Sequence, residues 1–150
     1  MAPEGVLIIG YGSPLRGDDA AGPLAARRLA ARGFQALEAH QLTPELAEPV
    51  ATARTVVFLD AHAGLAPGTV SVKRLDAREE PLSLLEHYAS PGGLLRLARM
   101  AYGAEPEAWL IEMGGEDFEL NHRISPAAQR AVARAIQEVM RCMNQELSKI

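Results

Sequence analysis

The sequence predicts a three-layer α/β/α domain, in which a mostly parallel, twisted sheet of about five strands carries helices on both faces. Short apolar runs such as Val6–Ile9 and Thr55–Leu59 are rich in β-branched residues, which is typical of central strands covered on both sides. Helical segments fall between these runs, and this alternation favours parallel strands. The chain has 150 residues, 48% of them hydrophobic, which is enough for one core. We therefore expect one domain over residues 1–150.

Three further segments complete the expected sheet. Ala108–Met113 is a third largely apolar run, and it stops at two glycines. Thr69–Leu75 alternates between apolar and polar residues, as an edge strand or a strand with one exposed face does. Gln35–Gln41 is a less regular candidate.

The helices have recognisable start signals. Asp18–Arg32 is rich in Ala, Leu and Arg, and Pro23 is compatible with a helix only near its first turn. Ser90-Pro91 and Ser125-Pro126 each look like an N-cap followed by proline at the first helical position. Apolar residues at three- and four-residue steps predict one buried stripe on the last helix: Val132, Ala135, Ile136, Val139, Met140 and Met143.

Composition excludes several classes of protein. The 15 Lys and Arg residues against 19 Asp and Glu give a net charge of −4, which argues against nucleic-acid binding through a basic field. The one cysteine, Cys142, excludes an internal disulfide and a multi-cysteine zinc site, and we expect it to pack in the core. The N-terminus lacks the basic segment of a signal peptide, and no apolar run reaches the ~20 residues of a membrane helix. We therefore expect a cytoplasmic protein with no membrane partner. We also expect a monomer, since the assigned core leaves no sizeable apolar stripe over.

Acidic residues follow two of the expected central strands. Asp18 and Asp19 lie in the glycine-rich segment after the first strand, and Asp60 directly ends the second. Ligands of such sheets bind beyond the carboxyl ends of the strands. His87 precedes the helix start at Ser90, and carboxylates together with imidazole suit nickel, zinc or iron. The pattern indicates a divalent metal site at this edge.

Each of these residues also has a structural interpretation. Either Asp18 or Asp19 could cap the following helix, and taken alone this is the more common role. Asp60 follows five apolar residues, which is more typical of a site residue. His62 could be a further ligand or a bystander, and His87 alone would be an ordinary loop histidine. His40 and His122 have no supporting context.

Taken together, these segments resemble one known family. The first strand with Gly10–Gly22 resembles the opening signature of the hydrogenase maturation proteases, Gly-x-Gly-[Asn/Ser]-x-x-x-x-Asp-[Asp/Glu]-x-x-Gly. Val56–Ala61 resembles the family's strand that runs into Asp-Ala, and His87 ahead of Ser90–Ala98 resembles its histidine before a leucine-rich helix. Gly115–Glu119 is similar to its C-terminal portion. The resemblance covers nearly the whole chain.

The resemblance implies an endopeptidase that removes the C-terminal extension of a nickel-containing hydrogenase large-subunit precursor after nickel insertion. It implies that Asp19, Asp60 and His87 are the catalytic, metal-contacting residues. The nickel would come with the precursor, and we expect no tightly bound metal in the isolated enzyme. An alignment anchored on Ser90-Pro91 would instead place Gly92 at the histidine position, so His62 stays open as the nitrogen ligand.

Two other functions remain in competition. A protein of the same fold could bind nickel or the precursor without cleaving it. A nucleotide-binding domain would rest on Gly10-x-Gly12 alone, and the third glycine of the dinucleotide fingerprint is misplaced, because Gly17 comes two residues late.

Overall fold

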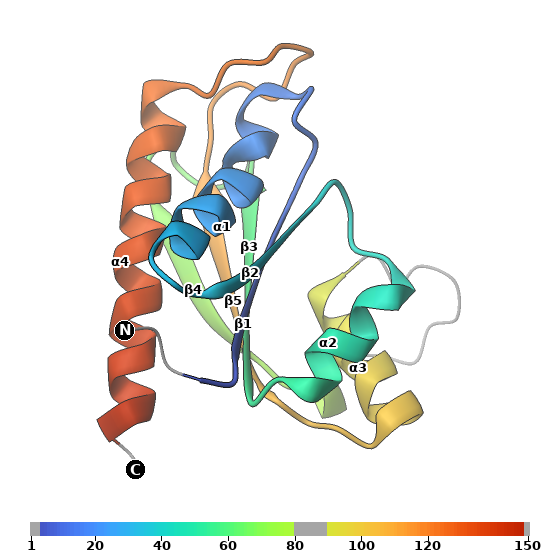
Figure 1. Ribbon diagram of the computed structural model, residues 1–150. Coiled ribbons are helices and arrows are strands. Elements are labelled where there is room, and N and C mark those ends of the chain that lie inside the picture. Colours follow the sequence, from blue (N-terminus) through green and yellow to red (C-terminus); the bar gives the residue numbers. More distant parts are fainter. Residues whose placement is uncertain (1–3, 80–89, 149–150) are drawn as a thin grey trace.

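A computed structural model describes residues 4–79 and 90–148 of the chain. The strands form one five-stranded sheet in the order β2-β1-β3-β5-β4 (Figure 1). The pairs β1–β2, β1–β3 and β3–β5 are parallel, whereas β4 is antiparallel to β5 at the edge, so the predicted sheet and its edge strand are confirmed. The strands are β1 Val6–Tyr11, β2 Gln35–Ala39, β3 Thr55–His62, β4 Val70–Leu75 and β5 Glu107–Gly114.

Helices cover both faces of the sheet, as predicted. In Figure 1, α1 and α4 lie together on one face, and α2 and α3 lie on the other. The two predicted serine N-caps are present: Ser90 Oγ accepts from Gly93 N–H at 3.0 Å, and Ser125 Oγ accepts from Ala128 N–H at 3.1 Å. The helices are α1 Ala21–Ala31, α2 Ala47–Thr52, α3 Pro91–Tyr102 and α4 Pro126–Ser148, with 3₁₀ turns at Gly17–Ala20, Pro44–Leu46 and Ala77–Glu79.

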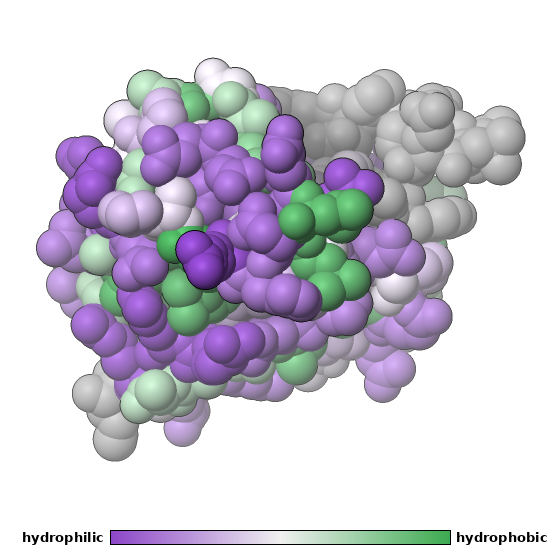
Figure 2. Space-filling view, turned by 90° about the horizontal axis from the view of Figure 1, so that it is seen from above, coloured by the Kyte–Doolittle hydropathy of each residue, from purple (hydrophilic) through white to green (hydrophobic). Residues whose placement is uncertain are grey.

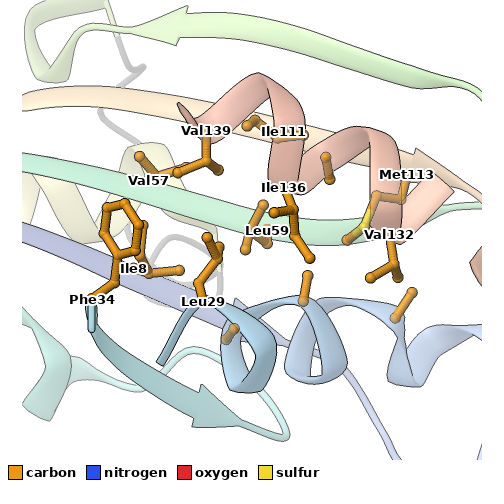
Figure 3. Packing of buried hydrophobic residues seen from close by; sticks show 14 of the residues in the cluster. Ile8, Leu29, Phe34, Val57, Leu59, Ile111, Met113, Val132, Ile136 and Val139 are labelled. Carbon is orange, nitrogen blue, oxygen red and sulfur yellow. The ribbon is translucent and has the colours of Figure 1, made fainter. Parts of the chain in front are cut away.

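Successive strand residues point to opposite faces and so supply two separate cores. The first core lies between the sheet and α1 and α4, and Figure 3 shows Ile8, Val57 and Leu59 meeting Leu29 and the apolar side of α4. The second lies between the sheet and α2 and α3. It includes Leu7, Ile9, Val56, Phe58, Val50, Leu94 and Leu95.

Two expectations about the helices are corrected. Met140 is 37% exposed, although its neighbours in the predicted stripe are buried. Successive residues of a helix are rotated by about 100°. The middle of the buried stripe is formed by Val132, Val139 and Met143, and Met140 lies at its margin. The helix expected from Asp18 begins only at Ala21, after the 3₁₀ turn.

The short α2 was not predicted from the sequence, because its six residues include too few apolar positions to show a helical period. Within the ranges that the structure describes, no helix combines the length and apolar character needed to cross a membrane.

Candidate active site

Tyr11, Asp60 and Glu112 lie on one face of the sheet at the carboxyl ends of its parallel strands. Strand alternation places Asp60 on the same face as Phe58 of the second core, and the strand register sets Asp60 directly beside Glu112. Tyr11, the last residue of β1, packs against the second core. In Figure 1, α2 and α3 lie against the lower half of the sheet, whereas these strand ends point to the top. A polar row thus continues the apolar core toward the carboxyl edge.

Asp60 has a strongly perturbed carboxyl group. Burial raises its pKa to about 7, and the negative charges of Asp19 and Glu112 add to this rise. Hydrogen bonds from the Tyr11 hydroxyl and the Ala61 N–H oppose it. Burial and the adjacent Asp60 raise the pKa of the Tyr11 phenol, so Tyr11 stays a neutral donor. Asp60 therefore gains and loses its proton near neutral pH.

Asp19 reaches the same place from the 3₁₀ turn that follows β1. Ser13 N–H donates to Asp19 Oδ2 at 2.6 Å, and Oδ1 has no hydrogen-bond partner among the described residues. Gly12 has φ +148°, and a Cβ there would collide with the Asp19 carbonyl oxygen. Only glycine allows this approach. Asp19 acts electrostatically on both Asp60 and Tyr11, so two of the three predicted site residues are neighbours.

The adjacent Asp18 points the other way. It is fully buried, and its Oδ2 accepts from Glu116 N–H at 2.8 Å, Asp117 N–H at 3.0 Å and Ser125 Oγ at 2.7 Å. Its Oδ1 accepts from Ser125 N–H at 2.7 Å. Burial raises the pKa of Asp18, but these hydrogen bonds outweigh it and lower the pKa. Of the two consecutive acids, only Asp19 has an oxygen left for a ligand.

Neither of these acids caps α1, which corrects the structural interpretation of both. The N-cap of α1 is Ala20, and no side chain makes a capping bond there. Asp18 instead serves the start of α4 through Ser125. The sequence did not show this role of Asp18, because its partners lie about a hundred residues away.

Glu112 and Tyr11 are site residues that the sequence analysis missed. Glu112 is 8% exposed, and Lys73 Nζ lies 2.9 Å from its Oε1. His62 Nε2 lies 3.7 Å from its other oxygen. An acid inside the apolar run Ala108–Met113 was the available signal, since a strand buried on both faces seldom carries a carboxylate without a partner.

The histidine position of the site is less defined. His62 Nδ1 accepts from Gly64 N–H at 2.8 Å, which leaves the proton of a neutral ring on Nε2, facing Glu112. His87 lies outside the described residues, so its place in the site stays a prediction. Gly92 lies in the first turn of α3 and is buried. Among residues 4–79 and 90–148, no three His, Cys, Asp or Glu side chains are grouped closely enough to hold a metal ion.

Fold and site together define an α/β protein in which Asp60, near the end of β3, and Asp19, on the turn after β1, interact at the carboxyl edge of the sheet. No protein-family model and no curated protein matches the chain. Solved structures do match it over most of its length. NiFe hydrogenase maturation protease HybD from Thermococcus kodakarensis aligns with a TM-score of 0.75 and 25% identity, over 92% of this chain and 98% of that one.

Two further structures agree with this match. The hydrogenase maturating endopeptidase HybD from E. coli has a TM-score of 0.75 and 19% identity, over 94% of this chain and 93% of its own. NiFe hydrogenase maturation protease HycI from T. kodakarensis has a TM-score of 0.69 and 21% identity, over 93% and 92%. The chain has the fold of the hydrogenase maturation proteases, and the resemblance predicted from the sequence is confirmed at this level.

Proposed function

We propose that this chain is an endopeptidase that removes the C-terminal extension of a nickel-containing hydrogenase large-subunit precursor. The observation that carries the proposal is that Asp19, on the 3₁₀ turn after β1, and Asp60, near the end of β3, lie close enough for the charge of Asp19 to raise the pKa of Asp60. Two carboxylates held close together repel each other, which costs free energy. Such arrangements are typical of sites that bind cations or transfer protons. The similar structures are named as maturation proteases, which supports the same role here.

The substrate would bring its own nickel ion to the site. The free Oδ1 of Asp19 and the carboxylate of Asp60 would contact the ion, with His87 as the nitrogen ligand. Three protein ligands leave coordination positions for the precursor, so the ion would stay attached to the substrate. A cation held there can polarise the scissile carbonyl or lower the pKa of an attacking water. Cleavage would then depend on prior insertion of nickel.

The direct test is cleavage of a nickel-loaded precursor by the purified protein, followed as a mass decrease. We expect Asp19→Asn and Asp60→Asn to remain folded and to lose cleavage. Glu48→Gln, on the exposed surface of α2, is the matched control for removing one carboxylate and should cleave as the wild type does. Binding of the precursor by the wild type without any loss of mass would favour the non-catalytic alternative.

The nitrogen ligand is tested separately with His87→Ala and His62→Ala. We expect the first substitution to abolish cleavage and the second to retain it, because Nδ1 of His62 already accepts from Gly64 N–H and its Nε2 lies 3.7 Å from Glu112. The reverse result would transfer the ligand role to His62.

A further inference from the structure

The Asp18 carboxylate joins three segments at the carboxyl edge of the sheet. Its own loop, which follows β1, meets the loop after β5 through Glu116 and Asp117, and meets the start of α4 through Ser125. The backbone reinforces the junction, since Asp18 N–H donates to Asp117 O at 2.7 Å and Gly17 N–H donates to Asn121 O at 3.0 Å. The acidic loop is thus held against the loop that follows β5.

This junction is a helix-capping arrangement divided between distant parts of the chain. In a capping box, the side chain of the third helical residue accepts the N–H of the N-cap residue. That third residue of α4 is Ala128, which has no acceptor, and Asp18 accepts the N–H of Ser125 in its place. Ser125 Oγ completes the box by accepting from Ala128 N–H. The helix start and the acidic loop therefore depend on the same carboxylate.

Close packing around Asp18 requires glycine in the facing loop. A Cβ on Gly115 would lie 2.7 Å from Asp18 Cβ and 3.2 Å from Asp18 Oδ2. The same atom would lie 2.9 Å from Phe118 Cζ. Even the smallest side chain at position 115 would therefore displace the carboxylate of Asp18.

We infer that Asp18 is a positioning residue for Asp19. The two are consecutive in one 3₁₀ turn, Gly17–Ala20, so fixing the carboxylate of Asp18 fixes the backbone from which Asp19 projects. On the other side, Ser13 N–H holds one carboxylate oxygen of Asp19, and the second oxygen has no hydrogen-bond partner among the described residues. Asp18 itself contacts no ligand, because it is fully buried and all four of its bonds are internal. The inference rests on the proposed function for the role of Asp19.

The test compares Asp18→Asn with Ser125→Ala. The asparagine keeps the shape of the side chain but points an NH₂ group at N–H donors, so the whole junction should loosen. Ser125→Ala removes two bonds of the same cluster and leaves Asp18 its three backbone donors. We expect both variants to lower Tm, but only Asp18→Asn to lower kcat for precursor cleavage, by about tenfold or more, with KM within about twofold of the wild type.

A second measurement does not depend on activity. The amide resonance of Ser13 reports the Ser13–Asp19 hydrogen bond, and we expect it to shift in Asp18→Asn and to stay in place in Ser125→Ala. Should Asp18→Asn fail to fold, Gly115→Ala is the second variant, because it displaces the Asp18 carboxylate without removing its charge. We expect it to show the same loss of kcat and the same shift of the Ser13 amide resonance.

The inference is overturned if kcat falls equally in Asp18→Asn and Ser125→Ala at equal folded fraction, or if the Ser13 amide does not move. Normal cleavage by Asp19→Asn would instead overturn the proposed site. The Ser13 resonance would still decide whether Asp18 positions its neighbour.

Discussion

Asp18 and Asp60 are two aspartates withdrawn from solvent at the same end of the sheet, and their pKa values shift in opposite directions. Four donors converge on Asp18, and they lower its pKa in spite of complete burial. Asp60 receives hydrogen bonds from Tyr11 and Ala61 and faces two other acids, so burial prevails and its pKa rises to about 7. The number of donors that a buried carboxylate meets decides which of these outcomes it has.

The difference separates a carboxylate that joins segments of the fold from one that the proposed function assigns to a ligand. Asp18 stabilises the native state as an anion. Asp60 is destabilised as an anion, and a cation bound beside it would favour the ionised form.

Figure 2, which looks onto this end of the molecule, shows a mostly polar surface with small apolar areas. Leu15 and Leu120, in the loops joined beside Asp18, are 53% and 76% exposed.

The largest effect on activity should come from the substitutions of Asp19 and Asp60, alone and combined. Asp19→Asn and Asp60→Asn should each lower kcat/KM for precursor cleavage by roughly 100-fold or more, and the double variant should lose little beyond the more severe single variant, because groups that act as a unit are not additive. Single-turnover cleavage measures this. Multiplying losses would show that the two acids act independently.

Asp18→Ala should lower the free energy of unfolding at pH 7 by about 3 kcal/mol, since several buried donors lose their acceptor. The pKa of Asp18 is lowered in the folded state, so its contribution is complete above the pKa of an unfolded aspartate and is lost as the pH falls through the folded value. Denaturant unfolding should therefore show the two proteins converging in acid, below about pH 4. A difference that persists unchanged in acid would contradict the anionic role.

Asp60→Asn should have the opposite effect on stability. It should raise the free energy of unfolding by about 2 kcal/mol at pH 8, because the folded state no longer holds a buried carboxylate. The pKa of Asp60 is raised to about 7, so the wild type loses stability relative to the variant as the pH rises toward that value. Thermal unfolding at pH 5 and pH 8 tests this. Equal gains at the two pH values would contradict it.

The smallest effects concern the neighbours that set the pKa of Asp60. Asp19→Asn and Glu112→Gln should each lower this pKa below about 7, the first more than the second, and Tyr11→Phe should raise it, because the phenol hydrogen bond favours the anion. Titration of the Asp60 carboxyl carbon by NMR measures all three. Lys73 lies 2.9 Å from Glu112, and its charge weakens the effect of that acid.

The sequence predicted those parts of the fold that depend on local patterns. Apolar runs located the central strands, and Ser-Pro pairs located the starts of α3 and α4, because each signal lies within a few residues. The six-residue α2 and the exposure of Met140 depend on packing between elements, which a local pattern does not encode.

The residues of the candidate site also differ in whether a local pattern could reveal them. Asp60 could be named because an acid directly ends an apolar run, and Asp19 because it matches the acid in the glycine-rich signature after the first strand. Glu112 becomes a neighbour of Asp60 only through the register of β3 and β5. The resemblance selected Asp19 and not Asp18, but the structural role of Asp18 depends on Ser125 and Glu116, which only the fold brings to it.

The capping box shared between Asp18 and Ser125 also sets an order of events during synthesis. The two residues are 107 positions apart, so the first acidic loop is made long before the serine that completes its junction. Closing so long a loop has an entropic cost that nearby contacts do not have. A nascent chain that has not yet reached residues 116–125 has Asp19 but none of the donors that hold the Asp18 carboxylate beside it. The turn that carries Asp19 therefore lacks this anchor until residues 116–125 have been made and have folded back against the loop after β1.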